Sequence, residues 1–451
     1  MPAFVSGVRN WVQGFRQELP QPALLRWSSL FFTLFALTLL ISIALSQIFM
    51  TLAGICYAID LLRRPRVPFF PGVKLPLALY CLFTVLSVFF AANPAAGGDV
   101  IRKLTLFVIM LLAVNLITSH RHLVWIWRTM FVESAVAGLV ATGQFIAQYR
   151  ETRAAHPGRI YYYMTLTRIH GFMGHWMTFG GQQMLVFAVL AAYLLLGGRK
   201  AGTGAGNGTS KASESWARLR LAPGSVGWLI AAVVVLSIVL NFTRGVWIGC
   251  GAALFYLVAR RRARLLWALP LLGLAAYLGA PSLVRDRIVS LLHPSADPSV
   301  TARFEMWHVG LAMIRKHPLA GVGPNNINEV YLTYLRPGTY EPSWHEHMHD
   351  DYLQLAAERG LPCLAAWLWF MGALAWQILG VRRRLKRDGR PVWMADASLA
   401  AWLAFVAEGV FEFNFGTSPV LMLFLFAMSV PFAVDGLTRL SHDEPHGSLS
   451  A

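Results

Sequence analysis

Runs of about twenty consecutive apolar residues recur along almost the whole chain, and few folds can accommodate that pattern. An α-helix needs about 20 residues to cross about 30 Å of hydrocarbon, and roughly twelve segments meet this requirement. Hydrophobic residues make up 56% of the 451 residues, and charged residues only 14%. The sequence therefore predicts an all-α, polytopic membrane protein and argues against a soluble multi-domain enzyme.

The apolar runs divide the chain into four parts. We expect about nine spans within residues 1–280, a polar loop at 281–360, about three spans within 361–437 and a tail at 438–451. Two runs are too long for one helix, so 27–62 is expected to turn near 42–47 and 226–259 to break at 243–245. The remaining spans are expected near 75–92, 104–118, 123–148, 177–196, 265–280, 361–379, 393–415 and 419–434.

The formal net charge is +17, but Lys and Arg fall mostly in short clusters between apolar runs. Short loops that carry such clusters stay on the cytoplasmic side. They predict cytoplasmic termini and place the 281–360 loop, with Arg168 and Arg244, on the other side of the membrane. Because the basic residues do not gather on one face or tail, no nucleic-acid partner is expected. The four cysteines lie in or beside separate apolar runs, which indicates neither a disulfide framework nor a zinc–thiolate site.

Arg244 stands between two apolar halves in the sequence TRGVWIG. An arginine at the bilayer centre costs about 2.5 to 3.5 kcal/mol on insertion scales, so it is usually buried against a partner or faces a polar cavity. One interpretation is an arginine that reaches the interface at the outer end of two short spans. The other is an anion clamp, because a guanidinium offers bidentate donors to phosphate.

Two further arginines lie outside the predicted spans. Arg168 precedes a Gly-rich turn, and Arg303 opens a segment in which apolar residues repeat at helical spacing: Phe304, Trp307, Leu311 and Ile314. This repeat predicts an amphipathic helix against the membrane face, with its aromatic residues used for packing rather than ligand contact. The turn at 321–324, GVGP, lacks the preceding strand of a phosphate loop and is interpreted as a helix stop.

The stretch at 341–360, EPSWHEHMHDDYLQLAAERG, is the most unusual polar segment. His345, Glu346 and His349 form a literal H-E-x-x-H, which in zinc peptidases puts two histidines on one helical face. Asp350 and Asp351, however, are typical of an N-cap and first turn of a helix that starts after the histidines and ends at Gly360. Three interpretations remain open: a metal site, a polar loop, and His349 as a general base, with His347 and Asp350 as possible helpers.

Several of these motifs together resemble the O-antigen ligase and polymerase (Wzy_C) superfamily of bacterial envelope glycosyltransferases. The resemblance is carried by His349, Asp350 and Gly360 with YLQ at 352–354, TRGVW at 243–247, Arg303 with Trp307, HPL at 317–319 and GVGP at 321–324. Weaker features are NP at 93–94, RK at 102–103 and Arg168 with Gly171. The family usually has Asn, Ser or Gln where this chain has Asp350.

The resemblance implies a GT-C-like glycosyltransferase with a large periplasmic helical loop in a Gram-negative inner membrane. The donor would be a polysaccharide linked to undecaprenyl pyrophosphate, and the acceptor the lipid A–core oligosaccharide. His349 would deprotonate the acceptor hydroxyl, and Arg244, Arg303 and Arg168 would stabilise the pyrophosphate, so that no metal or other cofactor is expected.

Other functions are also compatible with these motifs. Within the same class, an O-antigen polymerase or a protein O-oligosaccharyltransferase would share them, although polymerases of this group more often have two large external loops. From other classes, a membrane zinc peptidase would use the H-E-x-x-H, and a lipid-linked sugar transporter would use the arginines but not His349.

Overall fold

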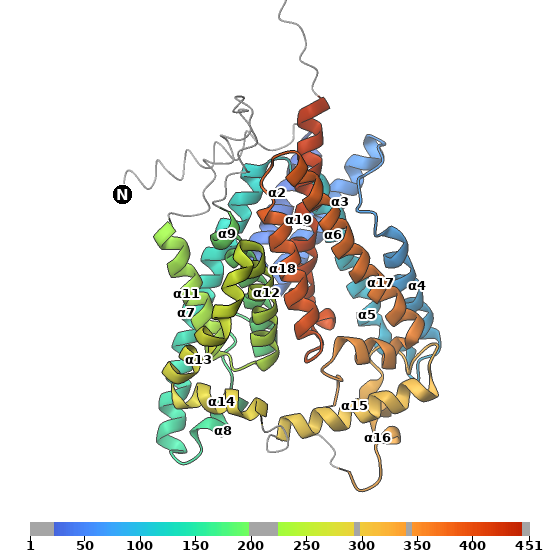
Figure 1. The fold of residues 1–451 in the computed structure, drawn as a ribbon. Helices are drawn as coiled ribbons and strands as arrows, with labels where there is room; N and C mark the ends of the chain where they lie inside the picture. The colour runs from blue at the N-terminus through green and yellow to red at the C-terminus, as the bar shows by residue number, and fades with distance from the viewer. Residues whose placement is uncertain (1–21, 198–223, 293–297, 340–344, 444–451) are drawn as a thin grey trace, which may run out of the picture.

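The protein is described here by a computed structural model that covers residues 22–197, 224–292, 298–339 and 345–443. All regular elements in these ranges are helices. The long helices run side by side, and four shorter or transverse ones gather at one end of the bundle (Figure 1). These are α8 (Ile160–Leu166), α14 (Ser282–Leu292), α15 (Pro298–Lys316) and α16 (Ile327–Tyr334).

The long helices coincide closely with the predicted apolar runs. In the first part of the chain they are α2 (Ala23–Thr38), α3 (Ile43–Arg63), α4 (Lys74–Phe89), α6 (Val108–Leu116), α7 (His120–Ala155), α9 (Trp176–Leu196), α11 (Gly224–Leu240), α12 (Arg244–Arg262) and α13 (Leu269–Gly279). The short elements η1 (Pro94–Gly97), α5 (Gly98–Lys103), η2 (Leu104–Phe107) and η3 (Ala263–Ala268) connect some of them. The later helices are α17 (Asp351–Arg387), α18 (Trp393–Glu408) and α19 (Ser418–Asp443), with η5 (Asn414–Gly416) before α19.

Both predicted breaks in the long apolar runs are present. The first lies slightly earlier than expected, because α2 ends at Thr38 and Ser42 caps α3 by accepting a hydrogen bond from the Leu45 N–H. The second lies at Thr243, where α12 begins with Arg244. Among the described helices, α3, α7, α9, α17 and α19 are long and apolar enough to cross a membrane, and α2, α4 and α11 are shorter apolar helices. The fold is that of an all-helical membrane protein.

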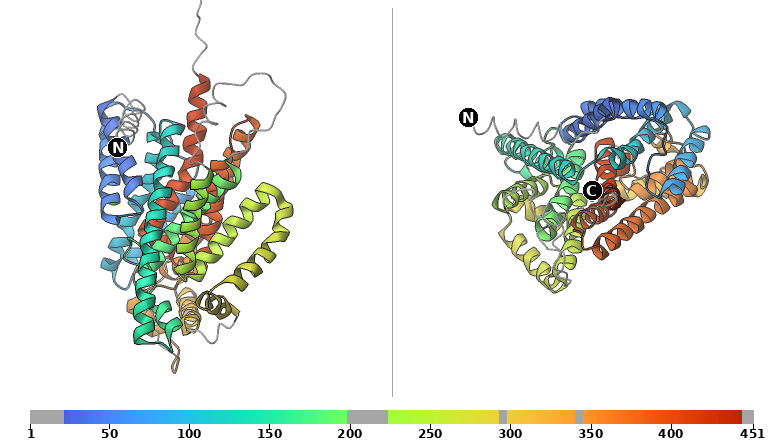
Figure 2. Two further views of the ribbon diagram at one scale, coloured as in Figure 1. Left: turned by 90° about the vertical axis from the view of Figure 1, so that its left-hand side faces the viewer. Right: turned by 90° about the horizontal axis from the view of Figure 1, so that it is seen from above.

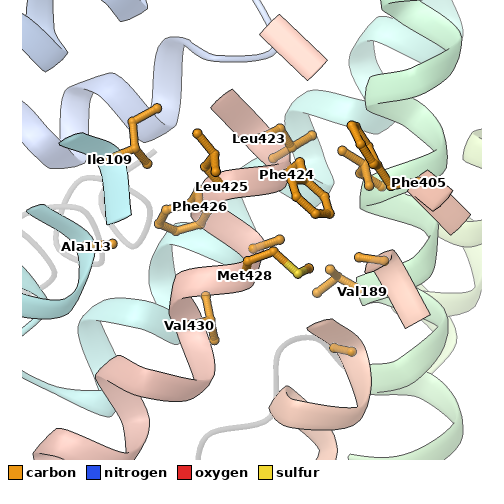
Figure 3. Packing of buried hydrophobic residues seen from close by; sticks show 14 of the residues in the cluster. Ile109, Ala113, Val189, Phe405, Leu423, Phe424, Leu425, Phe426, Met428 and Val430 are labelled. Atoms are coloured by element: carbon orange, nitrogen blue, oxygen red, sulfur yellow. The ribbon is translucent and has the colours of Figure 1, made fainter. Parts of the chain in front are cut away.

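Helix α19 forms the centre of the bundle (Figure 2). Its residues are apolar on every side, as expected for a helix that has protein neighbours all around. Phe424 stacks on Phe405 of α18, with ring centroids 4.1 Å apart, whereas Phe426 faces Trp127 of α7 at 5.5 Å. Figure 3 shows that α19 side chains also lie between Ile109 of α6 and Val189 of α9. This packing fixes α18 and α19, and therefore also the loop that joins them.

Helix α17 begins where the sequence predicts. Asp350 is its N-cap, and the carboxylate accepts a hydrogen bond of 2.7 Å from the Leu353 N–H. Gly360, with φ 82° and ψ 167°, interrupts the helix, as expected, and a second helical segment continues to Arg387. The long polar segment before α17 is thus tied to the membrane bundle at a defined point.

The turn that follows α15 packs its backbone against the backbone of α17 around Gly360. Val322 N donates to Ala357 O at 2.9 Å, and Leu361 N donates to Pro318 O at 2.8 Å. A Cβ on Gly321 would lie 2.2 Å from Glu358 C, and one on Gly360 would lie 2.2 Å from Leu319 O. Since α15 already ends at Lys316, the GVGP turn is a close-packing element rather than the helix stop that the sequence suggested.

Helix α15 is amphipathic, but its buried face differs from the predicted stripe. Met306, Val309 and Met313 are buried in a small separate core with Tyr331 of α16 and Met348. Phe304 and Leu311, which the repeat also contains, are 48% and 45% exposed. The helix therefore turns its sulfur-rich face toward the protein and leaves Phe304 beside open space.

Candidate active site

A cavity of about 900 Å³ is lined in part by α14 and α15. These two helices lie at one end of the bundle (Figure 1). The cavity wall comes from six separate stretches: the 165–178 segment, the start of α12, part of α14, the first turns of α15, the histidine loop and the α18–α19 loop. Arg168, Arg244, Arg303, His347 and His349 all line it. The tertiary structure thus brings together five candidates that the sequence spreads over 182 positions, since the outermost are Arg168 and His349.

His349 is held from both sides in a strained backbone conformation. Its φ is 49°, in the left-handed region that a side chain disfavours by about 1–2 kcal/mol. On one side Met348 is fully buried and its N–H donates to Gln354 Oε1 at 2.7 Å. On the other side Asp350 caps α17. Such strain clusters at functional sites, where neighbouring contacts over-determine the conformation.

The side chain of His349 contacts a carboxylate that sequence reasoning did not identify. Its Nδ1 lies 3.1 Å from Oε2 of Glu412, in the loop between α18 and α19. The Glu412 side chain is only 3% exposed, and Oε1 accepts a 2.6 Å hydrogen bond from Nη2 of Arg303. Arg303 also donates from Nη1 to Phe411 O at 2.7 Å. Glu412 therefore joins the histidine loop to α15.

Charge determines which atoms of this pair carry protons. Burial raises the pKa of Glu412, but the Arg303 charge and the contact with His349 outweigh it and lower that pKa to about 2. An ionised carboxylate can only accept hydrogen bonds, so Nδ1 of His349 is the donor. Nε2 of the neutral ring is then the unprotonated nitrogen. The geometry gives His349 the tautomer that a general base requires.

Four guanidinium groups surround the cavity: Arg168, Arg244, Arg287 and Arg303. Arg244 donates from Nη1 to Ser290 Oγ at 3.3 Å, which ties α12 to α14. Arg287 of α14 is only 4% exposed, and its Nε donates to Phe242 O at 3.0 Å. Arg168 donates to Thr165 O at 2.9 Å and lies over the Trp176 ring. These contacts with backbone, hydroxyl and indole groups hold the three arginines in place at the cavity wall.

The cavity carries an excess of positive charge. Among the described residues, its wall holds four guanidinium groups against two carboxylates, Glu346 and Glu412. Burial, together with the positive charges of Arg287, Arg303 and Arg244, lowers the pKa of Arg168 to about 9, although Glu412 opposes this change. An arginine that repels its neighbours in this way is stabilised when an anion enters. A polyanion is therefore the ligand that the electrostatics favour.

The predicted helpers have different positions. His347 lines the cavity beside Phe413, with ring centroids 5.4 Å apart. Burial, followed by the effect of His349, lowers the pKa of His347 to about 4, so the ring is neutral at pH 7. Asp350 is not part of the cavity wall, and its contact with the Leu353 N–H makes it a helix cap.

The H-E-x-x-H stretch does not form the helical face of a zinc peptidase. Residues 345–349 are non-helical, and the ring of His345 stacks on Tyr331 at 4.4 Å. In the parts of the chain that the structure describes, no three His, Cys, Asp or Glu side chains are grouped so that they could hold a metal. His345 and His349 therefore belong to different environments.

Two residues of the cavity wall, Glu412 and Arg287, were not singled out from the sequence. Glu412 and Glu408 interrupt the predicted 393–415 span, and carboxylates in such a run are themselves a signal of a functional site. Arg287, in LVRDRIVS, stands beside Asp286 and a second arginine, and nothing in that local pattern distinguishes it. The aromatic residues Phe304 and Trp307, expected to serve for packing, in fact line the cavity.

The fold and the site define a helical membrane protein with a cavity lined by arginines and by a histidine that contacts a buried carboxylate. Comparison with protein families gives the finer class. Residues 229–368 match the family model described as O-antigen ligase, and this segment includes Arg244, Arg287, Arg303 and His349. The match supports the predicted membership of this family over these residues. No curated protein matches the chain.

Proposed function

We propose that the protein is a ligase that transfers O-antigen polysaccharide from undecaprenyl pyrophosphate to the lipid A–core oligosaccharide. The observation that carries this proposal is the arrangement of one oriented histidine and four arginines around a single cavity. The histidine would deprotonate an acceptor hydroxyl, and the arginines would bind a pyrophosphate. The family match supports the same reaction type.

In the proposed reaction, Nε2 of His349 takes the proton of the acceptor hydroxyl as its oxygen attacks the anomeric carbon. The resulting imidazolium donates from Nδ1 to the ionised Glu412, 3.1 Å away, which stabilises the positive charge. The bond between the anomeric carbon and the pyrophosphate oxygen breaks, and the electron pair leaves with undecaprenyl pyrophosphate. Proton and electrons are thereby accounted for without a further reactant.

The arginines stabilise the charge that develops on the leaving group. Arg168, Arg244 and Arg287 contribute guanidinium groups from three separate elements. Arg303 differs, because it already holds Glu412 and Phe411. A guanidinium has more N–H donors than these two contacts use. Arg303 can therefore orient the Glu412–His349 pair and contact a phosphate at the same time. In this mechanism the arginines supply the positive charge, and no metal ion or cofactor takes part.

The membrane arrangement follows from the same proposal. The chain would have about twelve spans of GT-C-like organisation, about nine before residue 281 and about three within 361–437. Both termini, including the 438–451 tail, would be cytoplasmic, and the 281–360 catalytic loop would face the periplasm of a Gram-negative cell. The agreement between predicted runs and helix bounds supports the positions of these segments along the chain, and the basic clusters support the orientation. The lipid tail of the donor would enter between the helices.

Reconstitution tests the proposal. The full-length protein in proteoliposomes is supplied with a lipid-linked polysaccharide and rough lipopolysaccharide, and the extended acceptor is identified. We expect the lipid A–core to be extended. Transfer only to a second lipid-linked glycan would identify a polymerase, and transfer to a protein serine or threonine would identify an O-oligosaccharyltransferase. Movement of the donor across the membrane without a new glycosidic bond would overturn the enzymatic proposal in favour of a transporter.

A further inference from the structure

Trp307 combines two features that packing leaves unexplained. It lines the cavity, and its indole Nε1 is buried without a hydrogen-bond partner among the described residues. Buried donors are nearly always satisfied, so an unpaired one in a cavity wall points to a ligand that accepts from it. The Nε of Arg303, one helical turn earlier, is also buried and unpaired. Two buried, unpaired donors thus belong to neighbouring residues of one helix that both line the cavity.

The ring of Trp307 is also available for stacking. Its ring contact among the described residues is with Phe304, at 5.6 Å and 82°. A T-shaped contact covers at most one of the two indole faces. Trp176, which also lines the cavity, differs because its ring already stacks on His175 at 4.0 Å and lies under the Arg168 guanidinium. Of these two cavity indoles, Trp307 is the one with neither a stacked ring nor a cation over it among the described residues.

A flat aromatic face next to a lone donor matches the surface of a sugar. The C–H groups on one side of a pyranose ring pack against an aromatic face, and its hydroxyl groups accept hydrogen bonds from an indole N–H. Arg303 and Trp307 are four residues apart, about 6 Å along the helix. A phosphate and the sugar attached to it can therefore contact both side chains.

We infer that Trp307 binds the first sugar of the donor, the one linked directly to the pyrophosphate, by stacking on its ring and donating Nε1–H to a hydroxyl. This inference rests on the proposed function, because it takes the donor to be a glycosylated lipid pyrophosphate. It adds a specificity-determining residue. Trp307 places the anomeric carbon between the phosphate-binding arginines and His349, and it distinguishes the glycosylated donor from the spent carrier.

The test compares two lipids on the full-length protein in nanodiscs: undecaprenyl pyrophosphate and undecaprenyl-pyrophosphoryl-N-acetylglucosamine. The wild type is expected to bind the glycosylated lipid more tightly. Trp307→Leu should weaken binding of that lipid by about tenfold and leave undecaprenyl pyrophosphate unchanged. Trp307→Phe keeps a ring but loses the N–H, so it should lose about threefold. Trp228→Leu, at a 57% exposed tryptophan outside the cavity wall, is the matched control and should change neither affinity.

The outcomes separate this inference from the proposed function. If Trp307→Leu retains the wild-type preference for the glycosylated lipid, the sugar-binding role is wrong while the donor class stands. Equal weakening for both lipids would also overturn it, because Trp307 would then be structural. A selective rise in KM for the acceptor would assign the residue to the other substrate and contradict the inference. If the wild type binds neither lipid, the proposed donor class fails, and the sugar site fails with it.

Discussion

Two buried carboxylates in this protein each contact an arginine and one other polar side chain, but their surroundings differ. Glu412 contacts Arg303 at 2.6 Å and His349 at 3.1 Å. Asp396, in α18, contacts Arg382 at 2.6 Å and the Tyr256 hydroxyl at 2.6 Å. The side chains of both acids are 3% exposed or less. Judged by ion pairs alone, the two clusters would be equally good candidates for a functional site.

The difference lies in what each cluster leaves unsatisfied. Asp396 joins α12, α17 and α18, and Arg260 adds a second positive charge at 3.6 Å, so its cluster is internally complete. The Glu412 cluster borders a cavity with an excess of guanidinium groups, a strained histidine and an unpaired Arg303 Nε. A buried ion pair therefore does not by itself mark function. An ion pair is a better candidate for a functional site when a cavity, an excess of one charge and a strained residue lie beside it.

The largest expected effect comes from removing the base. His349→Ala should reduce sugar transfer by about 10³-fold, because general-base catalysis contributes roughly 10²–10⁴. Transfer is measured with the reconstituted protein, and folding is checked by its elution as one species from gel filtration. Tyr256→Phe, at the other cluster, is the control and should transfer sugar at the wild-type rate. Unimpaired transfer by His349→Ala would reject the base assignment.

Replacing each carboxylate by its amide compares the two clusters directly. Glu412→Gln should lower kcat by about 10²-fold, because it removes the charge that stabilises the imidazolium. In this variant the acidic limb of the rate profile should move to lower pH, since protonation of the histidine loses its anionic partner. Asp396→Asn should instead destabilise the fold by about 3 kcal/mol without changing kcat per folded molecule. A similar fall of kcat in both variants would show that Glu412 acts only structurally.

Arg303 and Arg382 allow a matched test of guanidinium geometry. Arg303→Lys keeps the charge but loses the fork that holds Glu412 and Phe411, so transfer should fall by about 30-fold. Arg382→Lys should leave transfer intact and lower only thermal stability. Activity of the Arg303→Lys variant at the wild-type level would mean that charge alone is required.

Arg287 tests the excess positive charge with a smaller effect. Arg287→Ala should weaken binding of undecaprenyl pyrophosphate by about tenfold, because one charge-assisted contact is lost. The control Arg260→Ala removes an arginine from the Asp396 cluster and should leave this affinity unchanged. Equal affinities of the wild type and the Arg287→Ala variant would exclude Arg287 from the phosphate site.

The smallest effect on sugar transfer is expected for His345, the first histidine of the H-E-x-x-H. His345→Ala should retain transfer within about twofold, because its ring stacks on Tyr331 rather than facing His349. Addition of EDTA should likewise leave the rate unchanged. Loss of activity in both experiments would revive the metal interpretation of this stretch.

Much of the fold was predictable because its signals are local. The apolar runs gave the helices, and Thr243 and Arg244 marked the break between α11 and α12. The N-cap at Asp350 and the interruption at Gly360 also lay where residue types alone placed them. The buried face of α15 was predicted less well, because the apolar stripe that packs depends on what α16 and the histidine loop present to it.

The sequence by itself indicated the helical membrane class, the resemblance to the O-antigen ligase family and the candidates His349, Arg168, Arg244 and Arg303. Each of these depends on a pattern within a few turns of chain, where propensity, capping and hydropathy act. Only the tertiary structure decided that Glu412, 63 residues from His349, is its partner, and that Arg287 faces the same cavity. Hydrogen bonds and charge interactions act across a few ångströms of space, whatever the separation along the chain. They are fixed when α17, α18 and α19 pack together.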